Sequence, residues 1–442
     1  MSAGKSKLFA AAALALLALA GCGRDVETDQ ARLCRMALPA LERPDAQVIL
    51  VAESESADSR GVEIAFRIAG EPFEHKALCR FRAPGRPNHS EDLIALDIDG
   101  ASLPRVKLYF LIRFWLATPE ARAADPAPFG DVSALPNLPH RAAYVLQQTI
   151  NGLPLTAVYA LLAAAYSLIY GLVGRINLAF GPLAAAGGYG AAFGALLMKG
   201  GPPGQVLGLS FVYAVFVAAT WGYASSRWVF LPLQRATGQI ALVATIGLAL
   251  FLDEMLRLTQ GSALQWVSPV LNQPFGVARS GDFIVTTTPN AGLAVTLALA
   301  AGVALLAAMK SSEFGRQWRA YADDAFAAQL MGVSPGQVFA IAFVTASALA
   351  GLAGFVMTMF YGAVGFGAAT SLGLKALAAA ILGGIGSIPG ALLGGLLIGG
   401  AEAVWSAVFP TDYRDVAVFG LLVLLLALRP GGILGASDPG AR

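Results

Sequence analysis

The chain has 442 residues, of which 56% are hydrophobic and only 13% are charged, and its mean hydropathy is +0.64. This composition excludes an ordinary soluble protein, and a formal net charge of +2 gives no electrostatic reason to expect nucleic-acid binding. All three cysteines and all three histidines precede residue 141, so the apolar remainder has no thiol or imidazole for nucleophilic or metal chemistry. We therefore expect no catalytic residues, no metal site and no enzyme.

The first 22 residues have the pattern of a bacterial signal peptide. Lys5 and Lys7 precede the apolar run Leu8–Leu19, and the chain then reads Leu-Ala-Gly-Cys, which resembles a lipobox. In that interpretation Cys22 is the lipid-anchored first residue of the mature chain. The alternative is an uncleaved signal anchor, and both interpretations place the following residues outside the cytoplasm.

Residues 23–104 are predicted to form a small periplasmic α+β domain. A helix over Glu27–Leu41 carries Cys34, and short strands are expected at Val48–Ala52, Val62–Ile68, Ala77–Arg82 and Leu93–Ile98. In an oxidising compartment Cys34 and Cys79 could form a disulfide that stabilises so small a core by ~3–4 kcal/mol. Two buried free thiols are the alternative, and the domain carries no motif that we can assign to chemistry.

The segment 105–141 is predicted to contain an interfacial helix followed by a linker. Arg105–Thr118 is too short to span a bilayer and combines three basic residues with aromatic ones. We expect it to lie at the membrane surface with its aromatic side chains dipping in, namely Tyr109, Phe110, Phe114 and Trp115. A buried amphipathic helix of the preceding domain is the alternative. Residues 119–141 are rich in Pro, Ala and Asp and indicate a linker.

Residues 142–435 are predicted to form an all-α polytopic membrane bundle of about 8–9 transmembrane helices. Their apolar runs are about 20 residues long, the length that a helix needs to cross roughly 30 Å of hydrocarbon. We expect spans near 146–172, 177–198, 205–226, 238–257, 290–309, 337–362, 372–384, 388–408 and 414–429. The seventh is short and is a candidate for a re-entrant helix.

The basic residues predict how this bundle is oriented. If the N-terminal domain is periplasmic and the spans alternate, the cytoplasmic side holds Arg175, Arg227, Arg235, Lys310, Arg316, Arg319, Arg429 and Arg442. The outer side then holds only Lys199, Arg257, Arg279 and Arg414. This excess agrees with the positive-inside rule, so we expect a multi-pass protein of the bacterial inner membrane with a cytoplasmic C-terminus.

A long polar stretch, Ser311–Gln337, separates two of the apolar spans. It contains a run of good helix formers, Arg316–Met331, followed by Gly332 and Pro335, which are helix stop signals. A simple turn between two spans needs only a few residues. We therefore interpret this stretch as a short cytoplasmic helix that serves as a docking surface for a soluble partner.

Several short motifs occur in a fixed order along 145–435. They are Asn151-Gly152-Leu153, Tyr159-Ala160-Leu161, Tyr170-Gly171, 174–181 (GRINLAFG), Leu231-Pro232-Leu233 with Arg235, Ala244-Thr245-Ile246-Gly247, Lys375-Ala376, 382–387 (LGGIGS) with Gly390-Ala391, and 428–435 (LRPGGILG). Together they resemble the permease subunits of branched-chain amino acid ABC importers. Each match alone is weak, but their shared order and spacing are specific. The domain and the lipobox before residue 105 lie outside the resemblance.

The polar stretch contributes a further match, with one departure. Ala327 and Ala328, followed by Gly332, are similar to the E-A-A-x-x-x-G coupling motif of importer permeases, but the acidic first position is Phe326 here. Asp323 and Asp324 lie about one turn upstream on a similar helical face and are candidates to replace it. The resemblance implies that these six residues couple the chain to an ATPase.

The resemblance also implies the partners of the chain. An importer of this kind combines a second permease subunit, cytoplasmic ABC ATPases that bind the ATP, a periplasmic substrate-binding protein and the membrane lipid. The permease itself then needs no cofactor. The solute would be a branched-chain or another apolar amino acid. Urea or short amides are the alternative cargo, and a lipid-anchored membrane sensor is a remote alternative from another functional class.

Four polar residues within or near the spans are candidates for lining the translocation pathway. They are Asn151, Asn177, Lys375 and Glu402. An ionisable group in a span is costly unless it faces a cavity or a partner, which favours function for the last two. A structural Lys375–Glu402 pair is an equally good interpretation, and the two asparagines could simply form hydrogen bonds that tie helices together.

Overall fold

The structure is a computed structural model. It describes residues 28–42, 48–56, 61–69, 73–82, 92–116, 118, 120–121, 124–126, 135–199, 201–235, 238–268, 270–272, 274–281, 283–365, 367–410, 413–429 and 431–435. The predicted signal peptide, its lipobox and Cys22 lie outside the described residues. The chain divides into two compact units, Met1–Asp131 and Val132–Arg442, and each is described here by itself.

Unit 1 is an antiparallel sheet packed with a short N-terminal helix. The helix α2 (Thr28–Ala37) continues into the 3₁₀ turn η1 (Leu38–Ala40). The sheet has the strand order β1-β2-β3-β4-β5, with bounds Val48–Glu55, Gly61–Ile68, Glu74–Phe81, Leu93–Ile98 and Ala101–Ser102. The predicted helix and four predicted strands are confirmed. Alternation in β2 buries Val62, Ile64 and Phe66, which form part of the core of this unit.

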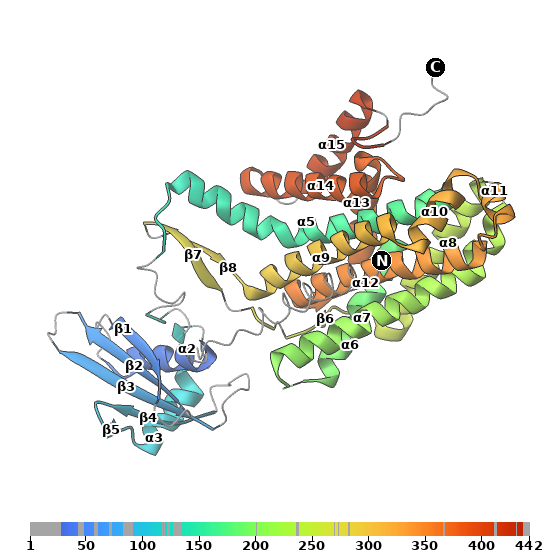
Figure 1. Cartoon of the computed structure of the whole chain (residues 1–442). Coiled ribbons are helices and arrows are strands. Elements are labelled where there is room, and N and C mark those ends of the chain that lie inside the picture. Colours follow the sequence, from blue (N-terminus) through green and yellow to red (C-terminus); the bar gives the residue numbers. More distant parts are fainter. Residues whose placement is uncertain are drawn as a thin grey trace. The chain divides into compact units, whose positions relative to one another are not determined.

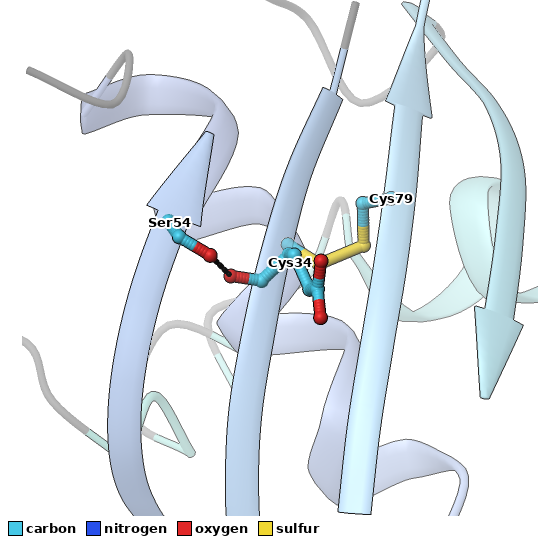
Figure 2. The surroundings of a disulfide bond; sticks show 4 residues. Cys34, Ser54 and Cys79 are labelled. Carbon is cyan, nitrogen blue, oxygen red and sulfur yellow. Dashed lines mark hydrogen bonds between the residues drawn. A yellow bond between two sulfur atoms is a disulfide. The ribbon is translucent and has the colours of Figure 1, made fainter. Parts of the chain in front are cut away.

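A disulfide and a buried arginine hold α2 in unit 1. Cys34 of α2 and Cys79 of β3 form the disulfide, with Cα atoms 5.9 Å apart (Figure 2). The neighbouring Arg35 is buried and donates to Asp125, Nε to Oδ1 at 2.9 Å, and to Glu53. Burial alone would lower the pKa of Arg35, but the hydrogen bonds and charges of Asp125 and Glu53 outweigh it and raise the pKa.

The segment after the sheet belongs partly to the core of unit 1. Helix α3 (Arg105–Phe110) runs into a π-helical turn, η3 (Leu111–Trp115), and its leucines pack in the core. Trp115 is half-buried, and its indole Nε1 donates to the Met36 carbonyl oxygen at 2.8 Å, so this side chain packs within the unit and fits the alternative of a buried amphipathic helix. Tyr109, Phe110 and Phe114 are exposed, so an aromatic face remains on the outside.

Unit 2 is a helical bundle in which every predicted span has a corresponding helix (Figure 1). Within the described residues, seven helices are long and apolar enough to cross a membrane. They are α5 (His140–Val173), α6 (Phe180–Leu197), α7 (Pro203–Ser225, continuing into η4, Ser226–Phe230), α8 (Gly238–Gln260), α9 (Pro289–Ser311), α12 (Pro335–Tyr361) and α14 (Ile388–Val408). The other two, α13 (Ala368–Gly383) and α15 (Arg414–Leu428), have only 16 and 15 residues.

Helix α5 is the centre of the bundle, and small residues allow its neighbours to approach closely. Much of α5 is buried, and α14 and α12 pack against it. A Cβ added to Gly395 of α14 would lie 2.3 Å from the Ala160 Cα of α5, and one added to Gly399 would lie 2.5 Å from the Thr156 Cα. Glycine at these positions therefore sets the distance between the two helices.

The helices of unit 2 run between two opposite ends. At one end, β6 (Gln265–Trp266) pairs with β9 (Ala363–Val364), and the Asn290 side chain donates to the Met359 carbonyl oxygen at 2.7 Å. The hairpin of β7 (Phe275–Ser280) and β8 (Phe283–Thr287) belongs to this end, which we call the β9 end. The other end carries α10 (Glu313–Asp323) and α11 (Ala325–Leu330), and we call it the α10 end. The sequence predicts that successive spans run in opposite directions, and α9 and α12, which run to and from the α10 end, do so.

Candidate functional site

The first candidate site is the polar stretch at the α10 end. Ser312 is the N-cap of helix α10, and its hydroxyl accepts from the Gly315 amide at 3.0 Å. Trp318 is buried and donates its Nε1 to the Leu168 carbonyl oxygen of α5 at 3.0 Å. Tyr321 packs edge-on against Phe339 of α12, with ring centroids 5.7 Å apart. Helix α10 is thus fixed to both α5 and α12.

Burial also affects the chemistry of α10. It raises the pKa of the Tyr321 phenol above its ordinary value, because a buried phenolate would be poorly solvated. Arg319 donates to the Met309 carbonyl oxygen near the C-terminus of α9, where a cation is favourable. The buried face of α10 therefore serves packing against the bundle.

The predicted continuous helix Arg316–Met331 is wrong, because the chain breaks at Asp324. This residue has extended backbone angles, φ −147° and ψ 104°, and ends α10. Its Oδ1 accepts from the amides of Phe326 and Ala327, both at 2.9 Å, and so caps α11. The prediction that Asp323 and Asp324 share a helical face with the start of the coupling motif is therefore also wrong. Within the chain, Asp324 serves as the N-cap of α11.

Helix α11 presents apolar side chains to solvent. Phe326 and Leu330 are each 72% exposed, and Met331 is 88% exposed, whereas Ala328 is buried against the bundle. Gly332 follows with φ +90°, which favours glycine, and no atom lies within 4 Å of a Cβ added there. Large exposed apolar side chains on a polar connection indicate an interaction surface. We call Phe326, Leu330 and Met331 the α11 face; the sequence analysis missed the last two.

The second candidate site is a cluster of charges toward the β9 end, built around a buried ion pair. Lys375 of α13 and Glu402 of α14 form an ion pair, Nζ to Oε1 at 3.1 Å, with side chains only 6% and 2% exposed. Lys375 Nζ also lies 2.6 Å from Asp415 Oδ1, and Arg414 Nε lies 3.2 Å from Glu402 Oε1. The Tyr159 hydroxyl of α5 donates to Glu402 Oε2 at 2.6 Å. We call these five residues the charge cluster.

The charge cluster brings together two residues that the sequence analysis proposed and three that it did not. Lys375 and Glu402 form the ion pair that was one of the two interpretations of these residues from the sequence. Asp415 is a second counterion for Lys375, and Arg414 is a second counterion for Glu402. Arg414 and Asp415 were missed as site residues because they stand at the start of a span, where charges are ordinary. Tyr159 lacked any signal besides its place in a family motif.

The two asparagines are not members of the charge cluster, and they have different hydrogen-bond partners from each other. Asn151 is exposed, and its Oδ1 accepts from Gln147 Nε2 at 2.8 Å. Gln147 in turn hydrogen-bonds the backbone of Thr286 in β8. Asn177 is buried between α5 and α6, and its Oδ1 accepts from the Ala179 amide at 3.0 Å. The contact of Asn151 lies within α5, and the contact of Asn177 lies in the connection between α5 and α6.

Comparison with known proteins identifies the class of this bundle. Residues 148–426 match the family model described as branched-chain amino acid transport system / permease component. The chain belongs to this family. It is 38% identical to the high-affinity branched-chain amino acid transport system permease protein LivH of Escherichia coli K12 over 298 residues, which cover 67% of this chain and 97% of the relative.

Two other relatives are also branched-chain amino acid transport system permease proteins. LivH of Salmonella typhimurium LT2 is 37% identical over 298 residues, and BraD of Pseudomonas aeruginosa is 37% identical over 300 residues, each with 67% of this chain and 97% of the relative covered. No solved structure matches the chain. The matched region contains both candidate sites and leaves unit 1 outside it. The protein is therefore a multi-pass membrane transport permease, and the predicted family is confirmed.

Proposed function

We propose that the chain is the membrane-spanning permease subunit of an ATP-driven importer for branched-chain or other apolar amino acids. The observation that carries this proposal is the 38% identity to LivH over 97% of that relative's length. The family model, which matches residues 148–426, includes the α10 end and the charge cluster. A periplasmic binding protein would deliver the solute, and separate ATPase subunits would hydrolyse the ATP. Nothing in the fold or in the relatives favours urea, short amides or a sensor as the alternative.

The proposed orientation places the α10 end in the cytoplasm and the β9 end in the periplasm. Lys310, Arg316 and Arg319 lie at the α10 end and support it through the positive-inside rule. Unit 1, which precedes α5, would then be periplasmic, where the Cys34–Cys79 disulfide is stable. The signal peptide and lipidation of Cys22 remain parts of this proposal.

Coupling to the ATPase would pass through the α11 face. Phe326 takes the place of the acidic residue of the coupling motif, so the groove that receives it is expected to be apolar at this point rather than basic. Closure of an ATPase dimer would move α11, and the contacts of Trp318 with α5 and of Tyr321 with α12 would carry the movement into the bundle. Different ATPase affinities for two bundle conformations would then shift their populations.

The test is co-purification of the tagged chain with its cytoplasmic ATPases. Because Phe326 and Met331 are exposed, Phe326→Asp and Met331→Asp leave the fold intact but place a charge in the proposed interface. We expect at least a ~10-fold loss of bound ATPase, about 1.4 kcal/mol. Trp266→Asp, an equally exposed aromatic residue at the β9 end, is the matched control.

Two results would contradict the coupling proposal. The first is retention of the ATPase by both α11-face variants, and the second is an equal loss in the Trp266→Asp control. Gly332→Asp is a useful third variant, but its positive φ means that any side chain also strains the turn after α11. Its effect therefore supports docking only if the Phe326→Asp variant behaves in the same way.

Unit 1 is proposed to rest on the membrane surface through α3 and η3. Phe110 and Phe114 are exposed and stack on one another, with ring centroids 5.5 Å apart, and basic residues flank them. In nanodiscs of the full chain, a photoactivatable lipid should label 105–116. The label should be lost in Phe110→Ser/Phe114→Ser and kept in the control Ile49→Ser/Val51→Ser, which alters exposed residues of β1. Absence of label in the wild type would overturn this proposal.

A further inference from the structure

The charge cluster contains two buried charges, and each of them has one exposed partner of opposite sign. Buried Lys375 is paired with Asp415, whose side chain is 57% exposed. Buried Glu402 is paired with Arg414, whose side chain is 50% exposed. The two buried charges also contact each other at 3.1 Å. The buried cation Lys375 and the buried anion Glu402 are therefore adjacent, and each also forms an ion pair with a half-exposed side chain.

The inner and outer contacts of the cluster differ in how readily they can be exchanged. Removing one partner of a buried ion pair leaves an uncompensated charge and is strongly unfavourable. An ion pair with a half-exposed side chain contributes little, because water can solvate the released group. A ligand that supplied its own carboxylate and its own cation could therefore displace Asp415 and Arg414 without leaving Lys375 or Glu402 unpaired.

We propose that the charge cluster is a binding site for the zwitterionic head group of an α-amino acid. The solute carboxylate replaces Asp415 on Lys375 Nζ, and the solute ammonium replaces Arg414 on Glu402 Oε1. An α-amino acid fits this exchange because both of its charged groups are attached to one carbon atom. Tyr159 holds the second carboxylate oxygen of Glu402 at 2.6 Å and so fixes the position of the acceptor.

This inference rests on the proposed function and makes it more specific. Urea and short amides carry no formal charge, so neither can replace Asp415 or Arg414 in an ion pair. Monoamines and monocarboxylates can replace only one of the two exposed partners. The site would thus select α-amino acids by their head group and leave discrimination among side chains to other residues or to the binding protein.

The experiment measures binding of radiolabelled L-leucine to the complete permease–ATPase complex in nanodiscs, without binding protein. We expect Lys375→Met/Glu402→Gln to lower affinity at least ~10-fold, while its folding is maintained because the two charges are removed together. Asp415→Asn removes a competing carboxylate and should raise affinity about fivefold, equivalent to the ~1 kcal/mol of an exposed ion pair. The control is Glu254→Gln/Arg257→Gln, an exposed ion pair on α8, which should leave affinity unchanged.

Competition by ligand fragments provides a readout that a purely structural cluster would not affect. 4-Methylpentanoate lacks the ammonium and 3-methylbutylamine lacks the carboxylate, so neither should displace L-leucine at concentrations where L-isoleucine does. The inference is overturned if the wild type binds no L-leucine, if either fragment competes as well as L-isoleucine, or if Asp415→Asn weakens binding. The Asp415→Asn result decides the matter even where the double variant fails to fold.

Failure of this inference can be distinguished from failure of the proposed function. Uptake of L-leucine by proteoliposomes that contain the complete importer and its binding protein tests the function independently. Uptake with unchanged binding in Lys375→Met/Glu402→Gln would refute only the zwitterion site. Uptake of urea but of no amino acid would refute the proposed function as well.

Discussion

Replacing Gly395 with leucine is expected to prevent α14 from packing on α5, whereas the same replacement at Gly400 is expected to be tolerated. A Cβ at Gly395 would lie 2.3 Å from the Ala160 Cα and 2.5 Å from its backbone nitrogen. These are backbone atoms of a central helix and cannot rotate away. The expected cost exceeds the ~1–3 kcal/mol that is usual for overpacking, because two whole helices must separate. At Gly400 no atom lies within 4 Å of an added Cβ.

The measurement is the yield of monodisperse detergent-solubilised protein, together with its thermal unfolding temperature. We expect Gly395→Leu to give little folded protein and Gly400→Leu to match the wild type. Gly395→Ala should give an intermediate result, because its single methyl group still meets the Ala160 backbone. Equal yields for Gly395→Leu and Gly400→Leu would show that α5 and α14 do not pack as described.

Replacing Glu402 with alanine is expected to destabilise the bundle by about 3–5 kcal/mol, the usual cost of removing one partner of a buried ion pair. Lys375 would keep Asp415 as its only counterion, and the Tyr159 hydroxyl would lose its acceptor. The matched variant Asp415→Ala removes a half-exposed carboxylate from the same cluster and should cost no more than ~1 kcal/mol.

Unfolding of each variant in mixed micelles with increasing denaturing detergent measures these differences. The order that we expect is wild type, then Asp415→Ala, then Glu402→Ala, with Lys375→Met/Glu402→Gln closer to the wild type than the single Glu402→Ala. A double variant less stable than Glu402→Ala would contradict the interpretation, because removing both buried charges together should relieve the unpaired one.

The positions of the membrane helices could be predicted from the sequence because hydrocarbon thickness sets the length of an apolar run. All nine apolar runs are helices, although α13 and α15 are shorter than the roughly 20 residues that a straight helix needs to cross the hydrocarbon. The strands of unit 1 could be predicted for a related reason, since β2 alternates between its buried and exposed faces. In both cases a single local periodicity determines the structure.

The break at Asp324 could not be predicted in the same way. Aspartate is compatible with a helix interior at modest cost and is also a preferred N-cap, and α11 has only six residues, too few to show a period. The surrounding run of helix formers therefore favoured one continuous helix. Only the hydrogen bonds from Phe326 and Ala327 distinguish the two structures.

The charge cluster could be predicted only in part, because it depends on contacts between distant residues. Charges within apolar runs identified Lys375 and Glu402, which are 27 residues apart, but the sequence alone did not decide whether they meet. Tyr159 lies 243 residues before Glu402 and reaches it only because small residues allow α14 to pack on α5. Long-range packing of this kind leaves no periodic signal.

The break between α10 and α11 separates anchoring from recognition within one connection. Substitutions on α11 can change the side chains offered to a partner without altering Trp318 or Tyr321, because Asp324 restarts the helix independently. Exchange of residues 325–332 for the corresponding segment of another permease should therefore transfer partner preference while the bundle folds as before. An engineer could therefore exchange the segment after Asp324 without redesigning α10.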